Sequence, residues 1–101
     1  MQQASLLVLD WRAVVAVSGN DAVAFLQGLV SNDMRRVASD RAVWTAFLTP
    51  QGKLLHEFMV VRDGERLLLD CERSRRADLV RRLRMYKLRS KVVVEESDEA
   101  V

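Results

Sequence analysis

Phe25-Leu26-Gln27-Gly28-Leu29-Val30-Ser31-Asn32-Asp33 is the most informative stretch of the 101-residue sequence. Its apolar residues recur at helical spacing from Ala22 onward, and Asp21 stands in front of them as a candidate N-cap. Three polar residues, Ser31 to Asp33, close the pattern. The stretch therefore predicts a short amphipathic helix over residues 21–30.

Strands are predicted before this helix. Residues 6–17 are apolar and rich in β-branched side chains, with an interruption at residues 10–12. This pattern indicates two short strands that are joined by a tight reversal. Ser18, Gly19 and Asn20 end the second of them.

Three further strands are predicted after the helix, over residues 42–48, 53–62 and 67–69. Pro50 and Gly52 suit the reversal between the first two, because proline fixes φ and glycine permits a positive φ. Asp63-Gly64 is a dipeptide favoured at the centre of a two-residue hairpin loop. The three strands are thus expected to form an antiparallel meander.

A second helix and a last strand complete the predicted fold. Ser74 is a candidate N-cap for a helix with an apolar stripe and a cationic opposite face, and residues 91–95 read as a strand. The predicted order is β-β-α-β-β-β-α-β. This is an α+β fold, an antiparallel sheet with two helices that cover one face.

The composition limits the classes of function. Half of the residues are hydrophobic, the net charge is +2, and Cys71 is the single cysteine, which is expected to be a small buried hydrophobe. No apolar run approaches the ~18 residues of a membrane span, and no secretory leader is visible. We expect one cytoplasmic domain, residues 1–101, that does not enter a membrane. No metal site is predicted.

Four segments in order resemble the start of a known superfamily. They are Gly19-Asn20-Asp21-Ala22 leading into Phe25 to Asp33, then Thr49-Pro50-Gln51-Gly52-Lys53, the hairpin over residues 58–69, and Lys91-Val92-Val93-Val94-Glu95. Together they are similar to the opening subdomain of the YgfZ and glycine-cleavage T-protein superfamily.

The resemblance implies that the chain is one half of a duplicated folate-binding domain, an N-terminal subdomain without the remainder. The motif K-G-C-Y-x-G-Q-E of the YgfZ proteins would lie in that remainder. The implied function is a tetrahydrofolate-binding module of a YgfZ-like protein that serves iron-sulfur cluster maintenance and tRNA modification, inactive as a fragment. A homodimer or the missing second subdomain is expected to cover the exposed sheet edge.

His56 and Glu57 occupy the positions of the superfamily's acidic pair. If they acted as an acid/base pair, the chain would be part of an aminomethyltransferase of the T-protein type. Their places on an alternating strand favour opposite orientations instead, with one side chain solvated and one paired locally.

Gln27, Asn32 and Asp33 are the candidate folate-binding residues, because carboxamide and carboxylate groups can pair with the amide and amino edges of a pterin. The alternative for Asn32 and Asp33 is local bonding to the main chain at a helix end.

The cationic second helix offers a different class of function. Arg75, Arg81 and Arg82 are candidates for binding phosphate or nucleic acid. The chain lacks interleaved aromatic residues and has carboxylates nearby, so nucleic acid is an unlikely partner and a solvated face is favoured. Four aromatic residues are expected in the core: Trp11, Trp44, Phe47 and Phe58.

Overall fold

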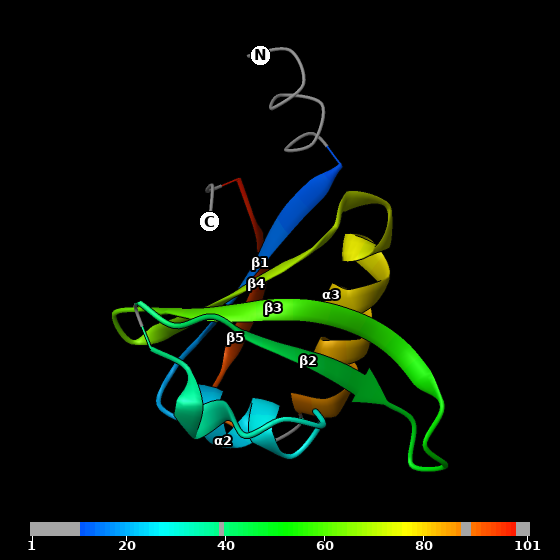
Figure 1. Ribbon diagram of the computed structural model, residues 1–101, viewed down its shortest axis with the longest axis horizontal. Coiled ribbons are helices and arrows are strands. Elements are labelled where there is room, and N and C mark those ends of the chain that lie inside the picture. The colour runs from blue at the N-terminus through cyan, green and yellow to red at the C-terminus, as the bar shows by residue number, and fades with distance from the viewer. Residues whose placement is uncertain (1–10, 39, 88–89, 99–101) are drawn as a thin grey trace.

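A computed structural model describes residues 11–38, 40–87 and 90–98 of the chain (Figure 1). The five strands form one antiparallel sheet in the order β2-β3-β4-β1-β5. The predicted α+β class and the meander are confirmed, while the first predicted strand lies outside the described residues. The elements are β1 (Arg12–Ser18), α2 (Ala22–Gln27), the 3₁₀ turn η1 (Met34–Arg36), β2 (Val43–Leu48), β3 (Leu54–Asp63), β4 (Arg66–Glu72), α3 (Arg73–Lys87) and β5 (Val93–Ser97).

One face of the sheet carries the main hydrophobic core. Alternate strand residues such as Val15, Phe58 and Leu69 are fully buried against Leu26 of α2 and Leu83 of α3. Burying each of these side chains stabilises the fold by about 1.5–3 kcal/mol. Both helices therefore lie on the same side of the sheet, as the apolar spacing predicted.

The β3–β4 hairpin turns one residue later than predicted. Asp63 pairs with Arg66, so the loop is Gly64-Glu65 and not Asp63-Gly64, and Gly64 adopts a φ of 63°. The inward residues Val60 and Leu69 are directly opposite each other. A shift of one residue in the pairing would move the inward side chains to the other face of the sheet. Burial therefore sets the register, and the register determines which residues form the loop.

Two predicted boundaries were wrong because tertiary bonds replace local signals. The α3 helix begins at Arg73, whose N–H donates to the Trp11 carbonyl at 2.8 Å, so Ser74 lies inside the helix instead of capping it. The last strand begins at Val93, since the Lys91 main chain is bound to Asp21. The Lys91 N–H donates to Asp21 Oδ2 at 2.8 Å, and the Asp21 N–H donates to the Lys91 carbonyl at 3.3 Å.

The contact between residues 19–21 and Lys91 requires a glycine at position 19. Its φ is 110°, and a Cβ at this position would lie 2.2 Å from the Lys91 carbonyl oxygen. A side chain would force apart the turn after β1 and the segment that leads into β5. The Gly-x-Asp motif is thus a backbone contact between residues 19–21 and Lys91.

The aromatic residues divide between two environments. Phe47 and Phe58 are buried, as predicted, whereas Trp11 and Trp44 are 57% and 49% exposed, so their assignment to the core was wrong. Trp44 alternates with the inward residues of β2 and therefore lies on the other face of the sheet. Among the described residues, no helix has the length and apolar character to cross a membrane.

Candidate functional site

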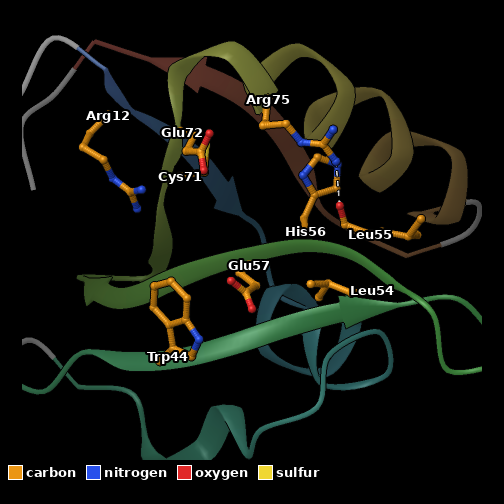
Figure 2. Close-up of a pocket in the computed structure, with 9 residues that line it drawn as sticks. All are labelled: Arg12, Trp44, Leu54, Leu55, His56, Glu57, Cys71, Glu72 and Arg75. Carbon is orange, nitrogen blue, oxygen red and sulfur yellow. Dashed lines mark hydrogen bonds between the residues drawn. The ribbon is translucent and has the colours of Figure 1, made fainter.

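A pocket opens where β3 and β4 separate. The two strands pair from the hairpin end, Asp63–Arg66, as far as Met59–Asp70. Beyond that pair, β3 lies beside β2 and β4 lies beside β1. The gap encloses about 260 Å³ (Figure 2). We call it the interstrand pocket. Its lining residues are Arg12, Trp44, Leu54, Leu55, His56, Glu57, Cys71, Glu72 and Arg75.

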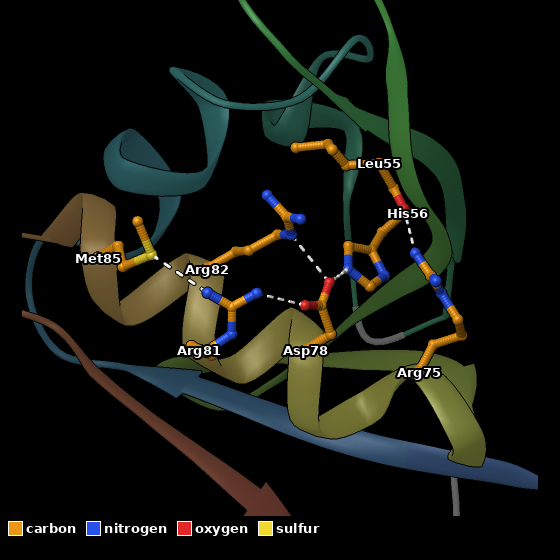
Figure 3. Close-up of polar contacts among 7 residues, drawn as sticks. All are labelled: Leu55, His56, Arg75, Asp78, Arg81, Arg82 and Met85. Atoms are coloured by element: carbon orange, nitrogen blue, oxygen red, sulfur yellow. Dashed lines mark hydrogen bonds and ion pairs between the residues drawn. The ribbon is translucent and has the colours of Figure 1, made fainter.

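His56 points inward from β3 and is paired with α3. Its side chain is 2% exposed, and Nε2 lies 2.8 Å from Asp78 Oδ2 (Figure 3). Burial lowers the pKa of His56 below its usual value, more than the hydrogen bond to Asp78 raises it. The imidazole is therefore neutral near pH 7, with its Nε2–H donated to the carboxylate.

Nδ1, the second ring nitrogen of His56, makes no hydrogen bond within the described ranges of the chain, although the ring is buried. Every fully enclosed side-chain nitrogen or oxygen among those residues has a partner. Nδ1 is therefore not fully enclosed. Because the tautomer leaves a lone pair there, His56 offers the site a hydrogen-bond acceptor.

Asp78 binds three neighbours at once. Its Oδ2 also accepts from Arg82 Nε at 2.8 Å, and its Oδ1 accepts from Arg81 at 2.6 Å. The bonds from Arg82, Arg81 and His56, in that order of size, hold the pKa of Asp78 far below its usual value. The carboxylate therefore stays ionised and keeps the imidazole in one orientation.

The cationic face of α3 is engaged with the protein itself. Arg81 and Arg82 bind Asp78, and Arg75 donates to the Leu55 carbonyl at 2.7 Å, which covers a main-chain group that the strand separation exposes. Further along, Arg84 and Lys87 donate to carbonyls of the β5 segment at 2.8–3.3 Å. Arg75, Arg84 and Lys87 thus fasten α3 to the sheet, whereas Arg81 and Arg82 pair within the helix and the Arg81 side chain remains 59% exposed.

Two carboxylates and an aromatic ring lie at the pocket's opening. The side chains of Glu57 and Glu72 have no hydrogen bond or ion pair among the described residues, and Trp44 is half exposed. Arg12 is already bound to Asp70 at 2.9 Å. The lining therefore combines two unpaired carboxylates and an aromatic face with the guanidinium groups of Arg12 and Arg75.

His56 and Glu57 point to opposite sides of β3, since His56 is buried and Glu57 is exposed. This is the arrangement that strand alternation predicted. Cys71, also in the lining, is buried as expected, and burial raises the pKa of its thiol to about 11. It remains a protonated thiol at neutral pH and is no nucleophile.

Gln27, Asn32 and Asp33 lie together, away from the lining of this pocket. Gln27 Oε1 accepts from the Met34 N–H at 2.7 Å, and its Nε2 donates to the Asn32 carbonyl at 3.3 Å. Asp33 accepts from the N–H and guanidinium of Arg35, which lowers the pKa of Asp33 to about 2. These side chains brace the loop after α2.

Asn32 joins that loop to the edge of the sheet. Its Nδ2 donates to the Trp44 carbonyl at 2.9 Å, and its N–H donates to Thr45 Oγ1 at 3.1 Å. The Ser31 N–H donates to the Ala46 carbonyl at 2.9 Å beside it. The loop therefore covers the free edge of β2 and fixes the strand that carries Trp44.

Sequence reasoning counted Asp78 only among the carboxylates that neutralise the cationic helix face, and it misplaced Trp44. Asp78 lies three and four residues before Arg81 and Arg82, a spacing that brings the three together on a helix and could have been read from the sequence. The contact between Asp78 and His56 could not be predicted in this way, because the two residues are 22 positions apart in the sequence.

A second hollow of about 370 Å³ lies between the loop after α2, the turn after β2 and the end of α3, where Tyr86 meets Phe47 edge to face at 5.8 Å. Its polar lining groups come mainly from the main chain, Ser31 and Thr49. It has no ionisable side chain apart from the phenol of Tyr86, so the interstrand pocket is the better candidate for chemistry.

The chain is similar in sequence to two kinds of curated protein. It is 40% identical over 94 residues to the mitochondrial iron-sulfur cluster assembly factor IBA57 homolog of Mycosarcoma maydis, covering 80% of this chain and 23% of that protein. It is 30% identical over 97 residues to the tRNA-modifying protein YgfZ of Escherichia coli, covering 96% and 30%. No protein-family model matches it.

The fold matches a solved structure. The glycine cleavage system aminomethyltransferase T of Bartonella henselae superimposes with a TM-score of 0.78 at 18% identity, over 86% of this chain and 24% of that one. This likeness shows the fold alone. The resemblance predicted from the sequence motifs is confirmed, and the chain spans less than a third of the length of these relatives.

Proposed function

We propose that this chain, a homologue of the IBA57 and YgfZ proteins with a T-protein-like fold, binds the pterin ring of tetrahydrofolate in the interstrand pocket. The observation that carries the proposal is the pocket itself. It places unpaired carboxylates, an aromatic ring and a neutral imidazole around one opening in the sheet.

The residues present fit a pterin. The 2-amino group and N3–H of a pterin form a two-donor edge, which one carboxylate such as Glu57 or Glu72 can accept bidentately. Trp44 offers a flat surface for stacking. The volume of about 260 Å³ lies below the ~300–1,000 Å³ of sites for drug-sized ligands, so it suits the bicyclic ring and leaves the glutamyl tail outside.

The biological role proposed is support of iron-sulfur cluster assembly. The role is taken from the relatives, which are an iron-sulfur cluster assembly factor and the tRNA-modifying YgfZ protein. Folate carries the one-carbon chemistry when it is bound, and the chain's own residues hold and orient it. The compartment and the covering of the sheet edge by a second copy or subdomain stay predictions.

Aminomethyl transfer is a weaker proposal. His56 and Glu57 fall on opposite faces of β3, so they cannot act on one group of a ligand as a pair. Phosphate binding by α3 is weaker too, because Arg75, Arg81 and Arg82 would have to leave internal partners.

Anaerobic titration with tetrahydrofolate tests the proposal. The sequence has two tryptophans, so Trp11→Phe leaves Trp44 as the only indole reporter. We expect saturable quenching of Trp44 and a loss of affinity of about tenfold or more in Glu57→Gln and Glu72→Gln combined, since each charged hydrogen bond contributes about 1.5–3 kcal/mol.

Glu95→Gln is the matched control, because Glu95 is an exposed strand carboxylate outside this pocket. It should leave the affinity unchanged. Absence of saturable binding, or equal losses in the control and the pocket variants, would refute folate binding at this site.

A further inference from the structure

The second hollow, between the loop after α2, the turn after β2 and the end of α3, lies outside the proposed folate site. It shares no lining residue with the interstrand pocket. Its volume of about 370 Å³ falls within the ~300–1,000 Å³ of small-molecule sites. The hollow is therefore large enough to hold a ligand of its own.

The walls of this hollow are mainly apolar. Four lining residues have aliphatic side chains: Leu29, Val30, Leu48 and Pro50. The ring of Tyr86, which is 43% exposed, meets the buried ring of Phe47 edge to face at 5.8 Å. Covering such walls removes apolar surface from water, which favours binding. The body of a ligand that fits here is therefore apolar.

The turn after β2 supplies a hydrogen-bond donor and a positive charge at one end of the hollow. Thr49 and Lys53 are bound to each other twice, since the Thr49 N–H donates to the Lys53 carbonyl at 2.8 Å and the Lys53 N–H donates to Thr49 Oγ1 at 3.0 Å. The Thr49 hydroxyl, an acceptor in this pair, still has its own hydrogen to donate. The ammonium group of Lys53 has no hydrogen bond or ion pair within the part of the chain that the structure describes.

The other polar groups around the hollow do not oppose an anion. Among the described residues, no carboxylate lines it. Carbonyl groups at the end of a helix attract cations, but those of Ala24 and Leu26 in α2 already accept from the N–H groups of residues 28–30. The polar end of a ligand at Thr49 is therefore expected to accept hydrogen bonds and to carry negative charge.

We propose that the second hollow binds a small carboxylate with an apolar body. The carboxylate accepts a hydrogen bond from the Thr49 hydroxyl beside the ammonium of Lys53, and the apolar body lies against Leu29, Val30 and the ring of Tyr86. This site is separate from the proposed folate site and does not depend on it.

Titration with octanoate, butanoate and octylammonium tests both parts of the proposal. The sequence has one tyrosine, so ¹³C labelling of tyrosine gives ring resonances that belong to Tyr86 alone. Octanoate should shift them saturably and bind about tenfold or more tightly than butanoate, because each fully buried methylene strengthens binding about fourfold. Octylammonium, which cannot accept a hydrogen bond from Thr49, should bind about tenfold more weakly than octanoate.

Four variants locate the carboxylate. Thr49→Val removes the hydroxyl and should weaken octanoate binding about tenfold, whereas Thr49→Ser keeps the hydroxyl and should bind like the wild-type chain. Lys53→Gln should weaken binding about two- to fivefold, as expected for an exposed charge. Lys91→Gln is the matched control, because Lys91 is an exposed lysine outside the hollow.

The affinities for octanoate and octylammonium are measured on the same sample, so a partly unfolded fraction cancels in their ratio. If octylammonium bound the wild-type chain as tightly as octanoate, or if Thr49→Val kept the wild-type preference, the inference would be overturned. Octanoate that leaves the Tyr86 resonances of the wild-type chain unchanged would overturn it too, whether or not the variants fold. None of these outcomes affects the proposed folate site, which is monitored through Trp44.

Discussion

Replacing Gly19 by alanine should destabilise the fold far more than the same change at other glycines with positive φ. The alanine Cβ would lie 2.2 Å from the Lys91 carbonyl oxygen and 3.0 Å from the Lys91 carbonyl carbon and Val92 Cα. All three atoms belong to the main chain and cannot rotate away. Backbone strain at this φ costs about 1–3 kcal/mol, and forced displacement of packed atoms adds about 1–3 kcal/mol. The expected total is ~2–6 kcal/mol.

Gly52 and Gly64 provide matched controls, because their φ values are 89° and 63° and an added Cβ would meet nothing within 4 Å. Their alanine variants should show only the backbone cost, about 1–2 kcal/mol. Urea unfolding followed by circular dichroism gives all three free energies of unfolding. If Gly19→Ala destabilised the chain no more than Gly52→Ala did, the contact between residue 19 and Lys91 would not be present as described.

Two further predictions concern His56 and Asn32. Burial lowers the pKa of His56, so the native state binds a proton on the imidazole less readily than the unfolded state does. The free energy of unfolding should therefore fall as the pH drops below 6.5. A titration midpoint above 6.5, measured by NMR for the single histidine, would contradict this prediction. Asn32→Ala removes the bonds to the Trp44 carbonyl and from the Asp33 N–H and should cost about 1–2 kcal/mol in urea unfolding. Asn20→Ala, at an exposed turn, should change the free energy little, and equal effects in both variants would argue against the role of Asn32.

The order of elements could be predicted because its signals are local. Alternation along residues 42–69 and the helical spacing of apolar residues depend only on neighbours in the sequence. Boundaries failed where a distant main-chain group decided them, as at Arg73 and Lys91. The pocket was beyond prediction for the same reason. It exists because β3 pairs with β2 and β4 pairs with β1 where the two strands separate. The sequence of one strand does not determine which other strand it pairs with.

The motif at residues 25–33 acts on the interstrand pocket indirectly and not by contact with a ligand. Gln27, Asn32 and Asp33 are joined to each other and to nearby main chain, and Asn32 binds the Trp44 carbonyl and the Thr45 hydroxyl. Trp44 in turn lines the interstrand pocket. A strand at the edge of a sheet has one side free to move unless something covers it, and here the loop covers it. The motif residues therefore support the aromatic wall of the pocket through the backbone of β2, and a ligand need not touch them to depend on them.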